Sequence, residues 1–266
     1  MRSEKPIEQR EAWLCSRLLA AGDNLMRQAH YQRLEERRLL EIMQAAHGRS
    51  VLDIGCGHGK YMALLASAGC LVTGVDLNAE QVAALRAQCW RAFTPDTLPN
   101  GERYDYILMS HVIEHMTPDE LVACLDRYLP FLNDDGKLII ITPLPGERFW
   151  HDFTHVRPYL PQSIRMAFGG IVAPSSNRVA QRMELEEIFF FKDSWRLRNH
   201  RAFYPSSSAP GLIRTALWLL NIFLAFLHRT SGGRLGAAAS WLGIYGKAGE
   251  KPNSRLDAAA LSNPRM

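Results

Sequence analysis

The sequence predicts an α/β protein built on a doubly wound, mostly parallel sheet of seven strands. Two observations carry this prediction. Short apolar runs alternate with helix-like segments between residues 49 and 143, which is typical of parallel strands joined by helices. The first run, at 51–54, leads into a glycine-rich turn, and the second, at 71–75, ends in Asp76. A bare turn beside a carboxylate at the next strand tip is typical of a nucleotide-type pocket.

Bulk composition narrows the class of protein. The chain has 266 residues, of which 47% are hydrophobic, which suits one large domain or one domain with an insert. Its net charge is +4 and its sequence pI about 8.9, without a dense Lys/Arg run, so we expect no nucleic-acid partner. The five cysteines lack CxxC spacing, which favours a reducing compartment. Residues 1–10 are charged rather than apolar, so we expect no secretory signal and a cytoplasmic location.

The expected elements follow in chain order. Residues 1–48 predict two helices that lie across the sheet edge near the pocket mouth, because apolar positions recur at three-to-four spacing. The core is expected at 49–192, with Asn78 and Thr117 as helix N-caps and a turn at 134–136. Its first part is predicted as strand 50–54, helix 60–68, strand 71–75, helix 79–87, strand 89–93, strand 104–109, helix 118–132 and strand 137–142.

Beyond residue 143 the pattern is less regular. A long ordered loop is expected at 144–159, a short helix at 161–168 and a strand at 186–191. Residues 193–240 predict an apolar helical insert on the acceptor side, with a Ser/Pro break at 205–210. A last strand is expected within 241–248, followed by a disordered polar tail at 249–266.

The glycine-rich turn carries Gly55, Gly57 and Gly59, a GxGxG spacing that differs from the GxGxxG of dinucleotide-binding dehydrogenases. Because glycine also joins ordinary strands to helices, the spacing alone leaves both readings open. Asp53 lies two positions before the first glycine, and Asp76 follows at the end of the second strand. These two carboxylates favour a binding pocket over an ordinary turn.

Together these residues resemble the first motif and the following acidic motif of class I S-adenosylmethionine-dependent methyltransferases. The segment YDYILMSHVIEH at 104–115 resembles the family motif around the fourth strand, and LNDDGKLIIITP at 132–143 resembles the segment that leads into the fifth. The resemblance covers residues 51–143. It implies a Rossmann-like methyltransferase fold, with S-adenosylmethionine as the cofactor.

The resemblance also implies a set of cofactor contacts. Asp53 is expected to bind the ammonium group, Asp76 the two ribose hydroxyls and Leu77 the adenine face. Asp76 as a helix-capping acid is the structural alternative. The family's polar contact to adenine has no clear counterpart here, and Asp96 is the candidate. The full predicted cofactor set comprises Asp53, Gly55, Cys56, Gly57, Gly59, Asp76, Leu77, Asp96, Ser110 and His111.

A hydroxyl acceptor needs a base close to the sulfonium. Glu114 and His115 recur there in the family, although they can also be a local cap and a packed side chain. The run FWHDFTHVRPY at 149–159 resembles a subgroup whose acceptors are often glycan or lipid-linked. We predict His155 as base or substrate ligand, with the other catalytic candidates Glu114, His115 and Asp152, and with Arg157 for an anionic acceptor. No Cys/His cluster has zinc spacing, so no metal site is predicted.

The most apolar run, at 212–227, has three readings: a core or dimer helix, an interfacial membrane helix, or a membrane span. It is shorter than the roughly 18–20 residues of a span, and Arg214 and Asn221 interrupt it. A wide apolar face bearing Trp218 and Phe223 suits a membrane interface.

The expected function is methyl transfer from S-adenosylmethionine to an oxygen of a small, glycan or lipid-linked acceptor. The protein is expected in the cytoplasm. Its apolar run is expected to contact the inner membrane face peripherally or to form a homodimer. Two alternatives stay open: a quinone-type O-methyltransferase, and a cofactor-binding interaction subunit without turnover.

Overall fold

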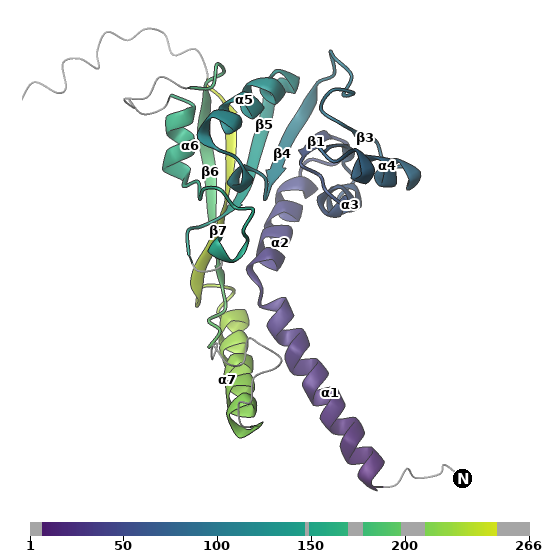
Figure 1. Cartoon of the computed structure of the whole chain (residues 1–266), viewed down its shortest axis with the longest axis vertical. Helices are drawn as coiled ribbons and strands as arrows, with labels where there is room; N and C mark the ends of the chain where they lie inside the picture. The colour runs from purple at the N-terminus through teal and green to yellow at the C-terminus, as the bar shows by residue number, and fades with distance from the viewer. Residues whose placement is uncertain (1–6, 147–148, 170–177, 198–210, 249–266) are drawn as a thin grey trace, which may run out of the picture.

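Figure 1 shows a computed structural model of the chain, which describes residues 7–146, 149–169, 178–197 and 211–248. The predicted tail at 249–266 and the predicted break at 205–210 lie outside the described residues.

The described residues form one seven-stranded sheet in the order β3-β2-β1-β4-β5-β7-β6. Neighbouring strands from β3 to β5 are parallel, whereas β7 is antiparallel to both β5 and β6. The fold-class prediction is therefore confirmed. The strands are β1 (Ser50–Ile54), β2 (Leu71–Val75), β3 (Ala92–Phe93), β4 (Tyr104–Ser110), β5 (Leu132–Pro143), β6 (Met183–Asp193) and β7 (Ala237–Lys247).

Helices cover both faces of the sheet, which is why its central strands read as continuous apolar runs. One apolar core joins the sheet to α5 and α6, and a second joins the other face to α2 and α3. Asn78 caps α4 by accepting from the amides of Glu80 and Gln81, and Thr117 caps α5 with a capping box, as predicted. The helices are α2 (Tyr31–Gln44), α3 (Lys60–Ser67), α4 (Ala79–Ala87), α5 (Pro118–Tyr128) and α6 (Pro161–Ala167).

Several predicted boundaries are wrong. The predicted helix 118–132 ends at Tyr128, because Pro130 follows and cannot continue an α-helix. The predicted turn at 134–136 lies inside β5, where the register to β4 slips between Leu132 and Lys137. Strand β3 keeps only two residues of the predicted 89–93, since Cys89 has a positive φ of 64°.

Two late strands also extend beyond their predicted bounds. β6 spans Met183–Asp193, and β7 starts at Ala237 rather than 241, because its alanines pair with Lys192 and Asp193. Alanine is a poor strand former, so this pairing was invisible in the sequence. The last strand therefore begins inside the predicted insert 193–240.

Helices α1 (Ile7–Gln28) and α7 (Gly211–Thr230) pack against each other and project away from the sheet (Figure 1). Gly22 allows the close approach, since a Cβ there would lie 2.5 Å from Ile222 Cδ1. Trp218 Nε1 donates to Asp23 Oδ1 at 3.1 Å. The prediction that both N-terminal helices lie across the sheet edge is therefore wrong, because α2 packs on a face of the sheet and α1 projects away from it (Figure 1).

Helix α7 is longer than its apolar run suggested. Its 20 residues have a mean hydropathy of 1.5 and only 12% of the apolar window is buried, so it is long and apolar enough to cross a membrane. The prediction that the segment is too short for a span is therefore wrong.

Candidate functional site

The glycine-rich loop after β1 folds tightly under the tip of β2. The amides of Gly55 and Cys56 both donate to the Val75 carbonyl, at 2.7 and 3.0 Å. Gly55 has a φ of +69°, and a Cβ there would lie 2.5 Å from Val112 Cγ2. A side chain would therefore meet both backbone strain and a clash, so the bare backbone is required here.

Asp76 joins this loop to the next one. Its carboxylate accepts from the Gly57 amide and from the Asn78 amide, each at 2.8 Å. The helix cap of α4 is Asn78 and not Asp76. The carboxylate thus sits at the strand tip with its position fixed from both sides.

A cavity of about 600 Å³ opens beside this loop. Leu77, 86% exposed, offers an apolar surface at its edge. Four predicted cofactor residues line the cavity, namely Gly55, Asp76, Leu77 and His111. Sequence reasoning missed lining residues supplied mainly by the segment after β4 and by α5, namely Pro95, Val112, Met116, Glu120, Ala123, Cys124, Arg127 and Tyr128. The sequence signal that could have found them is the position of α5 directly after Glu114 and His115.

Asp96, the adenine candidate, does not line this cavity. Its side chain is 90% exposed and pairs with Arg127 at 2.9 Å. Its neighbour Pro95 and its partner Arg127 line the cavity instead. Cys56 and Ser110 are buried and do not line the cavity, and Gly57 and Gly59 shape the turn.

Asp53 lies beneath the loop and is buried, 2% exposed. Its Oδ2 has no hydrogen bond among the described residues. Burial, and secondarily the charge of Asp76, raise the pKa of Asp53 to about 8. A buried carboxylate oxygen without a donor fits a cationic ligand group such as the ammonium of S-adenosylmethionine, and the glycine backbone and Asp76 fit its remaining parts.

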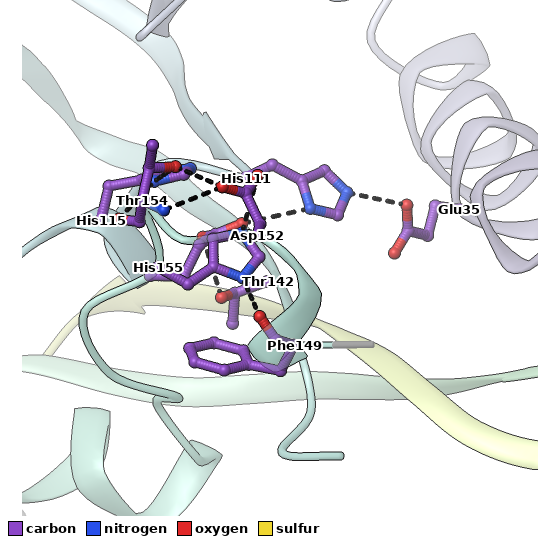
Figure 2. Close-up of polar contacts among 9 residues, drawn as sticks. Glu35, His111, His115, Thr142, Phe149, Asp152, Thr154 and His155 are labelled. Carbon is purple, nitrogen blue, oxygen red and sulfur yellow. Dashed lines mark hydrogen bonds and ion pairs between the residues drawn. The ribbon is translucent and has the colours of Figure 1, made fainter. Parts of the chain in front are cut away.

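His111 stands between two buried carboxylates at the end of β4 (Figure 2). Its Nε2 lies 3.1 Å from Glu35 Oε2, and its Nδ1 lies 3.3 Å from Glu114 Oε1. Burial lowers the pKa of His111, but the contacts with Glu114 and Glu35 outweigh it and raise that pKa to about 10. His111 also adopts a φ of +55°, a strained conformation typical of functional sites. Glu35, on α2, was not predicted, because nothing near it in the sequence marks a site.

The segment after β5 brings His155 next to His115 (Figure 2). The rings of His115 and His155 lie 4.9 Å apart, edge to face. His155 Nδ1 lies 2.8 Å from the Phe149 carbonyl, and His115 Nδ1 lies 3.2 Å from the Thr154 carbonyl. Asp152 Oδ1 accepts from the amide and hydroxyl of Thr154, which holds the turn.

All four predicted catalytic residues therefore lie together, and one ligand atom from each of Glu114, His115 and His155 falls within 4.8 Å of the others. The prediction of no metal site considered only spacing along the chain, and this cluster joins two separate segments. Arg157 lies over the Tyr159 ring, 5.8 Å from its centroid, and lines neither cavity.

A larger cavity, of about 1060 Å³, meets the first at His111 and His115, which line both. Its wall also includes Glu114, Asp152 and His155. Helix α2 contributes Tyr31 and Gln32 to this wall, and the segment after β6 contributes Trp195, Arg196 and Leu197. This cavity is large enough for a small-molecule or lipid-like acceptor.

The site combines a mostly parallel sheet, a glycine loop, a carboxylate at the second strand tip and an adjoining second cavity. This combination is that of a class I S-adenosylmethionine-dependent methyltransferase. A family model described as a methyltransferase domain matches residues 20–208. The chain belongs to this family, and the resemblance to class I S-adenosylmethionine-dependent methyltransferases is confirmed at the level of the family.

Known relatives match a smaller part of the chain. An uncharacterized methyltransferase of Staphylococcus carnosus is 31% identical over 121 residues, 43% of this chain and 56% of that protein. A ubiquinone biosynthesis O-methyltransferase of Bradyrhizobium sp. is 29% identical over 124 residues, 44% of this chain and 47% of that protein. The chain thus spans about half the length of these curated relatives.

Solved structures align over most of the chain at low similarity. A methyltransferase from Archaeoglobus fulgidus has 21% identity and a TM-score of 0.49, covering 82% of this chain and 100% of that one. The magnesium protoporphyrin IX methyltransferase of Synechocystis PCC 6803 has 16% identity and a TM-score of 0.49, covering 82% and 80%.

Proposed function

We propose that this protein methylates an oxygen of a lipid-linked acceptor that it takes from a membrane surface. The observation that carries the proposal is the meeting of the two cavities at His111 and His115. The smaller cavity fits the cofactor, so the larger one is the place for the acceptor. An acceptor hydroxyl beside His115 would face the methyl group of the sulfonium.

The chemistry asks little of the protein beyond placement, because the sulfonium is already an activated methyl donor. The acceptor oxygen forms a bond to the methyl carbon as the carbon–sulfur bond breaks, and its proton must leave. His155 is the predicted proton acceptor, since a carbonyl only accepts hydrogen bonds and so holds the proton of His155 on Nδ1. Its Nε2 is then left with the lone pair, and Glu114, His115 and Asp152 surround it in the same cavity.

The acceptor cavity is physically joined to α7. Leu197, in its wall, donates its amide to the Asn221 side chain at 2.8 Å and accepts from it at 3.2 Å. Helix α7 exposes large apolar side chains, namely Leu212, Ile213, Leu219, Leu220, Phe223 and Phe226. A membrane surface that covers this face would place lipid next to the cavity.

The reaction is tested by supplying labelled S-adenosylmethionine to the purified protein with separated acceptor pools. Lipid extracts, quinone-like phenols, sugar nucleotides and water-soluble extract form the arms. We expect label in the lipid arm. Label confined to the quinone-like phenols supports the quinone-type alternative, which the names of relatives such as the Bradyrhizobium protein favour. Cofactor binding without label in any arm supports the interaction subunit.

His155→Ala should leave cofactor binding unchanged, because His155 does not line the cofactor cavity, and should slow turnover. The measurement compares calorimetric affinity with the rate of label transfer at saturating cofactor. Unchanged turnover would remove His155 from the mechanism.

Membrane docking is tested by sedimentation with vesicles of phosphatidylcholine and phosphatidylglycerol. Phe223→Asp with Phe226→Asp should lower vesicle partition by at least about tenfold, because each apolar ring contributes on the order of 1 kcal/mol or more when buried. Leu71→Asp is the matched control, since Leu71 is also exposed but lies at the start of β2. If all variants partition equally, membrane docking is refuted. If the substitutions change only the molecular mass of the protein in solution, the apolar face is a dimer interface instead.

A further inference from the structure

We propose that Glu114, His115 and His155 bind a divalent transition-metal cation at the wall of the acceptor cavity. One ligand atom from each residue lies within 4.8 Å of the other two. Two imidazole nitrogens and one carboxylate oxygen form a common ligand set for zinc and for its neighbours in the first transition row. Zinc binds nitrogen and oxygen ligands at about 2.0–2.2 Å, so the three side chains would close around the ion.

The hydrogen bonds of both imidazoles point to the same conclusion. His155 Nδ1 faces the Phe149 carbonyl at 2.8 Å, and His115 Nδ1 faces the Thr154 carbonyl at 3.2 Å. A carbonyl oxygen can only accept a hydrogen bond, so the proton of each neutral ring lies on Nδ1. Each Nε2 then carries a free lone pair. Metal-bound histidines are held in this way, with the second ring nitrogen donating to a carbonyl or carboxylate.

Glu114 supplies the negative charge. It is fully buried, and its Oε2 accepts from the Thr142 hydroxyl at 3.0 Å. Its Oε1 has no hydrogen bond among the described residues and lies 3.3 Å from His111. His111 is shared with Glu35, which is also fully buried, so one imidazole serves two carboxylates. At least one buried negative charge is left over, and a cation beside Glu114 would compensate it.

A hydrogen-bonded cluster without a cation is the competing reading. That reading leaves the lone pairs of the three groups facing one another, with Glu114 buried, His155 half-buried and His115 exposed at the cavity wall. A bound cation turns this repulsion into coordination.

Three protein ligands beside a cavity are typical of catalytic rather than structural metal sites, because a further position stays open. That position would take an oxygen of the acceptor, and this step alone rests on the proposed function. The cation would lower the pKa of the bound hydroxyl, whose proton passes to water. The oxygen lone pair then bonds to the methyl carbon, and the carbon–sulfur electron pair returns to sulfur.

The test measures metal binding to the full chain, stripped with a chelator and free of cofactor and acceptor. Co²⁺ is titrated and followed by calorimetry and by its visible absorption, with Zn²⁺ in competition. We expect one Co²⁺ per chain with the absorption of nitrogen ligation. His155→Gln and Glu114→Gln should each weaken binding by at least about 100-fold, since even supporting partners of ligands cost 10–100-fold. His151→Gln, a histidine of the same cavity outside the cluster, should bind like the wild type.

Affinity for S-adenosylmethionine reports whether each variant is folded. If Glu114→Gln loses that affinity, His155→Gln decides, because His155 lies outside the cofactor cavity. If both lose it, the Co²⁺ spectrum of the wild type decides between nitrogen ligation and a hydrated ion. Absence of saturable binding, or equal affinity in wild type and folded variants, overturns the proposal. Because this test measures metal binding and not methyl transfer, its result does not depend on whether an acceptor is found.

Discussion

Removing the Asp76 carboxylate should weaken cofactor binding by about 1–3 kcal/mol. The carboxylate is held by the amides of Gly57 and Asn78, each at 2.8 Å, so it is in place before the ligand arrives. Hydrogen bonds to a charged group contribute about 1.5–3 kcal/mol each. Two such bonds to the ribose hydroxyls would cost more than the predicted loss of about 1–3 kcal/mol, but water replaces part of the loss at this half-buried position. In Asp76→Ala the dissociation constant should rise roughly 5- to 150-fold.

The assay is calorimetric titration of the purified chain with S-adenosylmethionine and with S-adenosylhomocysteine. Asp96→Ala is the matched control, because that carboxylate is 90% exposed and engaged with Arg127. It should change either affinity by less than about twofold, within the range of surface ion pairs. A loss below twofold in Asp76→Ala, or an equal loss in both variants, would refute the assignment of Asp76 to the ribose.

Three further predictions follow from the same loop and its surroundings. Gly55→Ala should lower the free energy of unfolding by at least about 1–2 kcal/mol in urea titration, because its positive φ and the contact with Val112 both oppose a side chain. Thr142→Val should cost about 1–3 kcal/mol in the same assay, since the buried Glu114 Oε2 loses its donor. The folded chain holds a proton on Asp53 up to a pKa of about 8, whereas the unfolded chain releases it near pH 4, so this group lowers stability as pH rises between these values. Asp53→Asn should flatten that slope in unfolding free energies measured from pH 5 to 8, and should abolish the proton release expected on cofactor binding.

The sequence was sufficient for the fold and the cofactor loop because their signals are local. Apolar runs, glycine spacing and the caps Asn78 and Thr117 each act within a few residues. The same holds for Asp76, whose place at a strand tip follows from the end of one apolar run. The predicted boundaries were wrong where a segment distant in sequence determines the structure. The first alanines of β7, for example, form a strand only because β6 pairs with them.

The acceptor side was predictable only in part. The EH pair and the run at 149–159 marked the catalytic residues, but not that His115 and His155 lie edge to face. Glu35 comes from a helix whose sequence shows only an amphipathic pattern, and its contact with His111 depends on how α2 packs on the sheet. Long-range pairs of this kind leave no periodic trace in a single sequence.

The roles of His155 as base and as metal ligand both require its Nε2, so they exclude each other. A base whose charge grows in the reaction is usually supported by a hydrogen-bonded carboxylate. That carboxylate accepts from the ring nitrogen opposite the one that takes the proton, which in His155 is Nδ1. Nδ1 faces the neutral Phe149 carbonyl instead, and Asp152 Oδ2 lies 3.8 Å from Nε2. His155 therefore lacks the carboxylate support of such a base, whereas a carbonyl at Nδ1 is sufficient support for a metal ligand. Methyl transfer that persists after chelation would favour the base, and transfer restored only by added cation would favour the ligand.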